Sequence, residues 1–216
     1  MSLGRLAILA AIVAIFTAPA RAEDDVSTNV KLLLAARNSD AAGLQRALGA
    51  GASPDSRSRI GETALLIALK KNDLATAKAM LAAGTNVNIA AANGVTPLMA
   101  AAFAGQDEMV TELLARGADI AAVDRLGKNA MTYAAGQGHA SIVQALLAKG
   151  VDPNAVYRND LTALMWAAGY GRDDAVKALL ASGARTDLRD NRGKTAADIA
   201  REGGYAQTVI LLQPPK

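Results

Sequence analysis

The sequence predicts an all-α solenoid, a stack of about six helix–turn–helix units that repeat every 33 residues. Two sets of residues recur at this interval. The first set can begin a helix, because each side chain can accept a hydrogen bond from the first helical turn: Thr63, Thr96, Asn129, Thr162 and Thr195. The second set follows apolar runs, as glycines do after the last turn of a helix: Gly51, Gly84, Gly117, Gly150 and Gly183. Helix starts and stops that keep one interval over five units indicate a repeat.

The composition favours a stack of thin helix pairs over a single globular core. Aromatic residues make up only 3% of the 216 residues, and small apolar residues dominate. A pair of large apolar residues also keeps the interval, at 80–81, 113–114, 146–147 and 179–180. These pairs are expected to form the buried side of the second helix in each unit.

The repeats are expected to occupy residues 30–212. The first unit has predicted helices over 30–37 and 41–48, and its polar outer side is typical of a terminal repeat that meets water. The last unit runs from Gly193 to Leu212, and the prolines that follow cannot continue a helix. Residues 23–29 are predicted to be a short polar lead, and residues 213–216 a C-terminal tail.

Short segments rich in turn-forming residues connect each glycine stop to the next helix start. They are predicted to form extended β-turn fingers that project from the helices. Most fingers carry a turn glycine shortly before the helix start, as Gly127 precedes Asn129. In the fifth unit Asp160 takes the place of that glycine.

This unit resembles the ankyrin repeat, and the resemblance covers nearly all of residues 30–212. The signature is clearest at Gly94-Val95-Thr96-Pro97-Leu98, whereas the other units have alanine in place of the proline. The resemblance implies a concave surface, made of the fingers and the exposed sides of the first helices, on which a partner protein binds. The chain is also similar to exported, periplasmic ankyrin proteins of proteobacteria, some of which are linked to periplasmic catalase and peroxide defence.

Residues 1–22 have the pattern of a secretory signal peptide. Arg5 precedes an apolar run, and Ala20-Arg21-Ala22 matches a small-x-small cleavage site before Glu23. An uncleaved membrane anchor is the alternative, although the run is shorter than the roughly 20 residues that span a bilayer. Removal of the segment would leave 21 of the 23 basic residues against 20 acidic ones, which gives no reason to expect a nucleic-acid partner. With no cysteine for a disulfide or a lipid anchor, we expect a soluble, monomeric periplasmic protein without a membrane contact after cleavage.

The sequence offers no catalytic group of residues, so the protein is predicted not to be an enzyme and to need no cofactor. One histidine, His139, and no cysteine cannot make a usual transition-metal site. Gly193-Lys194-Thr195 imitates the end of a phosphate-binding loop, but Leu188 stands where that loop needs its first glycine. We interpret the tripeptide as the opening turn of the last repeat.

Aromatic residues are expected to gather on the concave surface. Five of the six that follow the leader fall there: Phe103, Tyr133, Tyr157, Trp166 and Tyr170. Aromatic clusters are typical anchors of protein interfaces. The alternative is that Tyr133 and Trp166 pack between neighbouring first helices as part of the core, and the sequence leaves both interpretations open.

Arginines recur at the fingers, with the acids Asp124, Asp160 and Asp190 between them. The arginines predicted to contact the partner are Arg59, Arg125, Arg158 and Arg192. They could steer an acidic surface toward the aromatic residues. The alternative is a solvated rim that only keeps the loops soluble.

The predicted function is a non-catalytic scaffold that binds a partner protein through the third to fifth units. Three alternatives stay open: an immunity-type inhibitor of an exported toxic enzyme, a membrane-tethered spacer that keeps its N-terminus, and an enzyme with a site in the concave groove. The sequence does not identify the partner, since one fold serves many functions.

Overall fold

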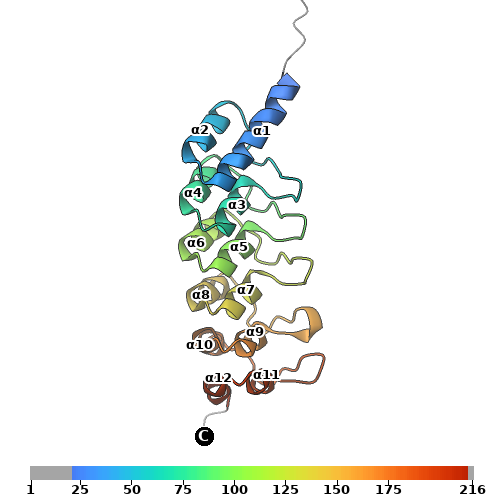
Figure 1. Ribbon diagram of the computed structural model, residues 1–216. Helices are drawn as coiled ribbons and strands as arrows, with labels where there is room; N and C mark the ends of the chain where they lie inside the picture. Colours follow the sequence, from blue (N-terminus) through green and yellow to red (C-terminus); the bar gives the residue numbers. More distant parts are fainter. Residues whose placement is uncertain (1–20, 214–216) are drawn as a thin grey trace, which may run out of the picture.

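Twelve α-helices form successive antiparallel pairs in a computed structural model, which describes residues 21–213 (Figure 1). The first three pairs are α1 (Arg21–Asn38) with α2 (Ala41–Gly49), α3 (Ala64–Lys70) with α4 (Leu74–Ala82), and α5 (Pro97–Ala104) with α6 (Asp107–Ala115). The next three are α7 (Ala130–Gln137) with α8 (Ala140–Ala148), α9 (Ala163–Gly169) with α10 (Asp173–Ala181), and α11 (Ala196–Glu202) with α12 (Ala206–Leu211).

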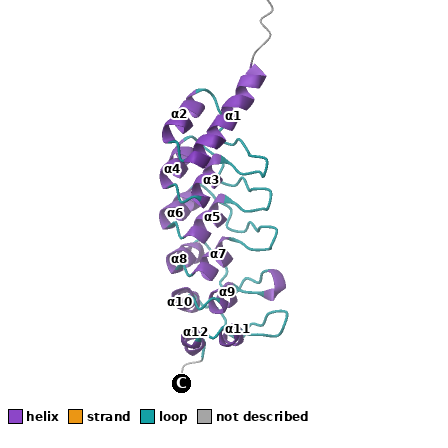
Figure 2. Ribbon diagram, in the orientation of Figure 1, coloured by secondary structure: helices purple, strands orange, loops and turns teal. Residues whose placement is uncertain are grey.

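The pairs stack in one direction, so that odd-numbered helices form one column and even-numbered helices a second. Each odd helix packs against the next odd helix, and the connecting loops project from their side of the stack (Figure 1). Figure 2 shows these loops in teal, and the described residues contain no β-strand. The predicted all-α solenoid is confirmed.

All five predicted helix starts act as N-caps of the odd helices α3 to α11. The side chain of Thr63 accepts a hydrogen bond from the backbone N–H of Leu66 at 3.3 Å, and Asn129 accepts one from Thr132 at 2.9 Å. Thr96, Thr162 and Thr195 make the same contact three residues ahead. These bonds satisfy N–H groups that have no partner within the helix.

The recurring glycines end the even helices with a left-handed residue. Gly117 has φ of 78°, and the next residue, Ala118, donates its N–H to the carbonyl of Leu113 at 2.9 Å. This is the Schellman arrangement, in which the turn after a helix satisfies its last carbonyl groups. Gly51, Gly84, Gly150 and Gly183 have the same backbone and the same bond from the residue that follows.

The core is one continuous layer between the two columns. In each recurring apolar pair of the even helices the first member is completely buried, as Leu113 is, while Leu114 is only partly buried. The odd helices contribute alanines together with larger side chains, such as Leu98 and Met99 in α5. Small residues let neighbouring helices approach closely, which explains the low aromatic content.

The first helix is longer than predicted. It begins at Arg21 rather than Val30, so residues 23–29 belong to α1 and do not form a separate lead. The segment is polar but contains neither glycine nor proline. No residue in it therefore prevents the helix predicted from Val30 onward from extending toward the N-terminus. Most of the expected leader (1–20) and the tail residues 214–216 lie outside the described residues. Among the helices of residues 21–213, none has the length and hydropathy to cross a bilayer.

The fingers are tight turns closed by their own backbone hydrogen bonds. In the finger of the fourth unit, Asp124 donates its N–H to the carbonyl of Lys128 at 2.8 Å, and Gly127 donates its N–H to the carbonyl of Asp124 at 2.9 Å. In the finger of the fifth unit, Asp160 replaces the turn glycine as predicted and adopts φ of 58°. Asn159 before it is also left-handed, and a short 3₁₀ helix, η1 (Arg158–Asp160), forms the tip.

Candidate functional site

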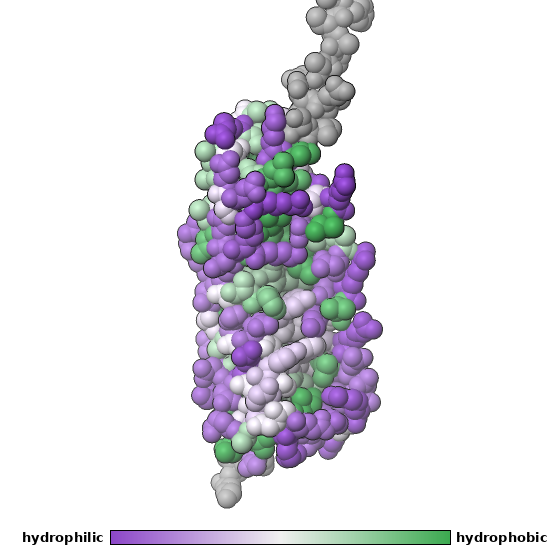
Figure 3. All heavy atoms as spheres, viewed as in Figure 1, coloured by the Kyte–Doolittle hydropathy of each residue, from purple (hydrophilic) through white to green (hydrophobic). Residues whose placement is uncertain are grey.

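The candidate site is the face made by the fingers and the odd helices of the third to fifth pairs. Four aromatic residues lie along it, which we call the aromatic strip: Phe103, Tyr133, Trp166 and Tyr170. Figure 3 shows pale and green residues along the middle of the lower part of the molecule, and green residues among the purple, hydrophilic ones in the upper part.

The strip consists of two ring pairs. Phe103 and Tyr133 meet edge to face, with centroids 5.7 Å apart and an interplanar angle of 89°. Trp166 and Tyr170 are stacked at 6.2 Å and 17°. Both geometries are favourable for aromatic rings.

The two outer rings of the strip are the exposed ones. Phe103 keeps 52% and Tyr170 50% of its surface open to solvent, whereas Tyr133 and Trp166 are half-buried and pack against the core. The two interpretations of Tyr133 and Trp166 are therefore both partly right, because each ring supports the core on one side and faces solvent on the other.

Lys128 joins the two ring pairs. Its Nζ lies 4.3 Å from the ring centroid of Trp166 and 5.6 Å from that of Tyr133. An ammonium group at this distance is attracted by the negative face of an aromatic ring. The strip thus has a cation at its centre, which was not predicted from the sequence.

Asp124 holds the finger that carries Lys128. The carboxylate is buried and accepts hydrogen bonds from the backbone N–H of Leu126 at 2.8 Å, from that of Lys128 at 2.9 Å, and from the hydroxyl of Tyr133 at 2.6 Å. Burial, reinforced by Asp124, raises the pKa of Tyr133 well above its usual range, so the hydroxyl stays protonated and donates. Finger and strip are therefore fixed to each other.

The end of the strip lies beside a glycine. Gly136 of α7 has no side chain, and a Cβ there would lie 3.7 Å from the ring of Tyr170. The ring of Tyr170 thus lies across the preceding helix. The carbonyl of Gly136 accepts a bond from Nε of Arg172 at 3.1 Å, which ties the fourth and fifth pairs together.

The family comparison agrees with this geometry. The model described as "Ankyrin repeats (3 copies)" matches residues 32–124, 96–157 and 130–215. The chain belongs to the ankyrin repeat family. No curated protein matches the chain. The face described above is therefore the finger side of an ankyrin repeat stack, and each helix pair with its finger is one ankyrin repeat.

The second and sixth ankyrin repeats carry ion pairs where the central repeats carry the strip. Glu62 and Lys70 pair at 2.8 Å in the second repeat, and Lys194 pairs with Glu202 in the sixth. Lys128 occupies the repeat position of Glu62 and Lys194, but Gly136 stands where its partner would be. Within residues 21–213 Lys128 thus forms no ion pair, and the ion-paired repeats delimit the strip on both sides.

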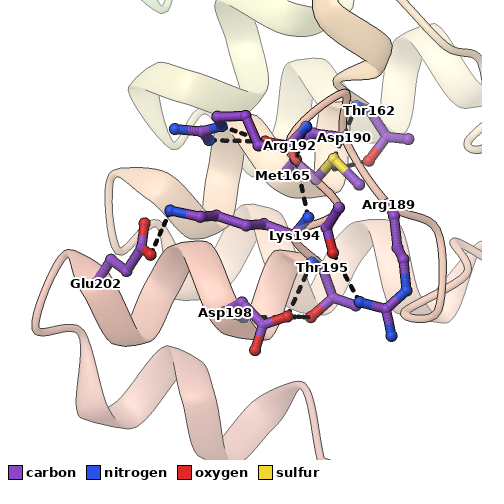
Figure 4. A network of polar contacts seen from close by, with 10 residues as sticks. Thr162, Met165, Arg189, Asp190, Arg192, Lys194, Thr195, Asp198 and Glu202 are labelled. Carbon is purple, nitrogen blue, oxygen red and sulfur yellow. Dashed lines mark hydrogen bonds and ion pairs between the residues drawn. The ribbon is translucent and has the colours of Figure 1, made fainter.

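Figure 4 shows the polar network of the sixth ankyrin repeat, which confirms that Gly193-Lys194-Thr195 is an opening turn. Asp190 accepts bonds from the backbone of Arg192 and Lys194, as Asp124 does in the fourth repeat. Burial would raise the pKa of Asp190, but these bonds and the Arg192 guanidinium outweigh it and lower the pKa. Bonds from Thr195 and from Arg201 lower the pKa of Asp198 to about 2.

The finger arginines divide into two groups. Arg192 is bound by Asp190, with Nη2 2.7 Å from the carboxylate. Arg59, Arg125 and Arg158 are exposed, and within residues 21–213 none of them forms an ion pair. The predicted acids between them do not lie at the rim as a group, because Asp124 and Asp190 are buried inside their own fingers. The central fingers therefore expose positive charge.

Tyr157 is placed differently from the prediction. It lies at the base of its finger, half-buried, and its hydroxyl accepts a hydrogen bond from Nδ2 of Asn129 at 3.1 Å. Burial raises the pKa of the Tyr157 hydroxyl. Tyr157 is outside the two ring pairs, but it lines a pocket of about 220 Å³ together with Lys128 and Trp166. A second groove, of about 360 Å³, lies beside Phe103 and Tyr133.

Three polar residues that bind one ankyrin repeat to the previous one were missed. Gln106 donates to the carbonyl of Leu69 at 2.8 Å, the ring Nε2 of His139 lies 3.1 Å from the carbonyl of Phe103, and Arg172 reaches Gly136. All three occupy one position, 33 residues apart, directly after a left-handed glycine. Their shared position in the repeat could have predicted their common role from the sequence. His139 thus has a structural contact, and in the part of the chain that the structure describes no three acidic or histidine side chains gather to hold a metal.

Proposed function

We propose that this ankyrin repeat protein is a non-catalytic scaffold that binds one partner protein with its aromatic strip and central fingers. Ankyrin repeats generally mediate protein–protein interaction, which supports a protein as the partner. The observation that carries the proposal is the exposure of Phe103 and Tyr170 on one face, together with exposed finger arginines that form no ion pair within residues 21–213. Aromatic and arginine side chains are the commonest residues at which binding energy concentrates.

We also propose that the protein acts in the bacterial periplasm as a monomer, where it supports an exported enzyme such as a catalase. The leader-like residues 1–22 support export. N-terminal sequencing of the protein purified from its native cells tests it. We expect the mature chain to begin at Glu23, and a chain that begins at Met1 or Ser2 would contradict the proposal.

Truncation of the exposed rings tests the binding face. We expect Phe103→Ala and Tyr170→Ala each to weaken partner binding about tenfold, the usual size for an interface aromatic. The rings are half exposed, so the melting temperature should change little. The measurement is affinity capture of the partner from the native compartment by each variant, followed by titration of the partner identified.

Tyr205 provides the matched control. It is also a partly exposed aromatic residue, but it lies in the turn before α12, against Gly171 and Gly203, and it belongs to neither ring pair of the strip. Tyr205→Ala should leave capture unchanged. If the double variant Phe103→Ala/Tyr170→Ala still captures the partner as well as the unaltered protein, the assigned face is wrong.

A further inference from the structure

We infer that the centre of the strip binds a carboxylate of the partner, within an extended segment in which acidic residues alternate with apolar ones. This inference rests on the proposed function, since it names the chemistry of the partner at the same face. Lys128, the pocket beside it and the apolar side chains around that pocket carry the argument.

Lys128 lacks an acid where its repeat counterpart has one. Lys194, two repeats further on, is neutralised by Glu202, and the equivalent of Glu202 beside Lys128 is Gly136. The ammonium of Lys128 instead lies over two aromatic rings. Rings attract the charge but take up none of its three N–H donors in a directed bond to oxygen. An acceptor oxygen from outside can therefore bind there, and a carboxylate makes the strongest such bond.

The fingers open beside this lysine. Neighbouring fingers are elsewhere joined tip to tip by one backbone bond, from Ala92 to Ile60, from Arg125 to Asn93 and from Asn191 to Asn159. Among the described residues no such bond joins Arg158 to Leu126, where the left-handed pair Asn159 and Asp160 reshapes the fifth finger.

The pocket of about 220 Å³ lies at this opening. It is smaller than the roughly 300 Å³ or more of typical small-molecule sites, so its size suits a single side chain. Its lining includes Leu126, Lys128, Tyr157, Arg158 and Trp166.

Charge and apolar surface alternate around the pocket. Arg158 lines it and Arg125 precedes Leu126 on the opposite finger. Neither arginine forms an ion pair within the described residues, and Asp160 is the exposed acid nearby in sequence. Leu126 is 59% exposed, and Tyr170 stacks on Trp166. An acidic side chain flanked by apolar ones is complementary to this surface in charge and in hydropathy.

The single tryptophan of the chain, Trp166, gives a direct reporter for this site. The probes are three short synthetic peptides that alternate leucine or phenylalanine with glutamate, with glutamine or with lysine, each labelled with a fluorophore. Fluorescence anisotropy of the label measures affinity, and Trp166 emission in unlabelled titrations reports on occupancy of the site. We expect the glutamate peptide to bind about tenfold more tightly than the glutamine peptide and to change Trp166 emission, since charge-assisted bonds are about twice as strong as neutral ones.

Variants of two equivalent lysines separate this site from general attraction. Lys128→Gln should weaken the glutamate peptide about fivefold, the size of a partly exposed charge pair, and Lys128→Arg should restore most of the loss. Lys194→Gln removes the same charge at the equivalent position of the ion-paired repeat and should have no effect. Thermal melts of all three variants check that the fold is intact.

The inference is overturned if the glutamine peptide binds as tightly as the glutamate peptide, if no peptide binds, or if Lys128→Gln leaves affinity unchanged. None of these results removes the proposed function, which depends on capture of the natural partner through Phe103 and Tyr170. Loss of that dependence would instead remove the proposed function, whatever the peptides do.

Discussion

Replacing Leu113 by alanine is expected to lower the free energy of unfolding by about 3 kcal/mol. Leu113 is completely buried in α6, at the centre of the stack, and its carbonyl also accepts the bond from Ala118 that ends the helix. The substitution removes apolar contacts and leaves a cavity that short helices on both sides can fill only in part. Because each ankyrin repeat contacts only its neighbours, a defect in a central repeat weakens two interfaces.

Urea denaturation followed by circular dichroism measures this effect, and Leu114→Ala is the matched control. Leu114 is the next residue of the same helix and is only half-buried, so its truncation should cost about 1 kcal/mol. Equal losses for the two variants would show that the recurring pair does not face the core as described.

Replacing Asp124 by alanine is expected to cost about 2–3 kcal/mol, because three donors lose a charged acceptor at once. They are the N–H groups of Leu126 and Lys128 and the hydroxyl of Tyr133. The finger should then loosen, and Lys128 should lose its fixed place over the rings. We therefore expect Asp124→Ala to weaken partner binding as well as stability.

Two further variants make this prediction specific. Asp124→Asn keeps an acceptor for the two backbone N–H groups and should recover most of the stability. Asp119→Ala removes an exposed aspartate that accepts one bond, from the N–H of Ala121, and should cost well under 1 kcal/mol. A melting temperature of Asp124→Ala equal to that of the unaltered protein would contradict the role assigned to the carboxylate.

The repeat architecture could be predicted because single residues determine it locally. A threonine that caps a helix, or a glycine at positive φ such as Gly117, acts on the backbone within a few residues of itself. Because five copies of each residue recur at one interval, chance does not explain the pattern. The predicted start of α1 was wrong because no residue that ends a helix stands before Val30. The apolar pattern of the helix does not show how far it extends into the polar segment that precedes it.

The candidate site was predicted only in part, because it depends on contacts between repeats. The position of Phe103 and Tyr170 on the exposed face follows from their place in the repeat. The role of Lys128 does not, since it requires the rings of Tyr133 and Trp166 to lie on either side of its side chain. A comparison of its position with Glu62 and Lys194 would have shown that one charge lacks a partner. The buried role of Asp124, by contrast, depends on the shape of the folded finger.

Site-specific photo-crosslinking tests the central claim, that the partner binds the aromatic strip, most directly. A photoreactive amino acid is placed at Phe103 or Tyr170, and in separate proteins at Lys78 of α4 or Lys177 of α10, which are exposed on the other column of helices (Figure 1). We expect a covalent adduct with the partner from positions 103 and 170 and none from 78 and 177. Adducts from the second pair of positions without adducts from the first would contradict the claim.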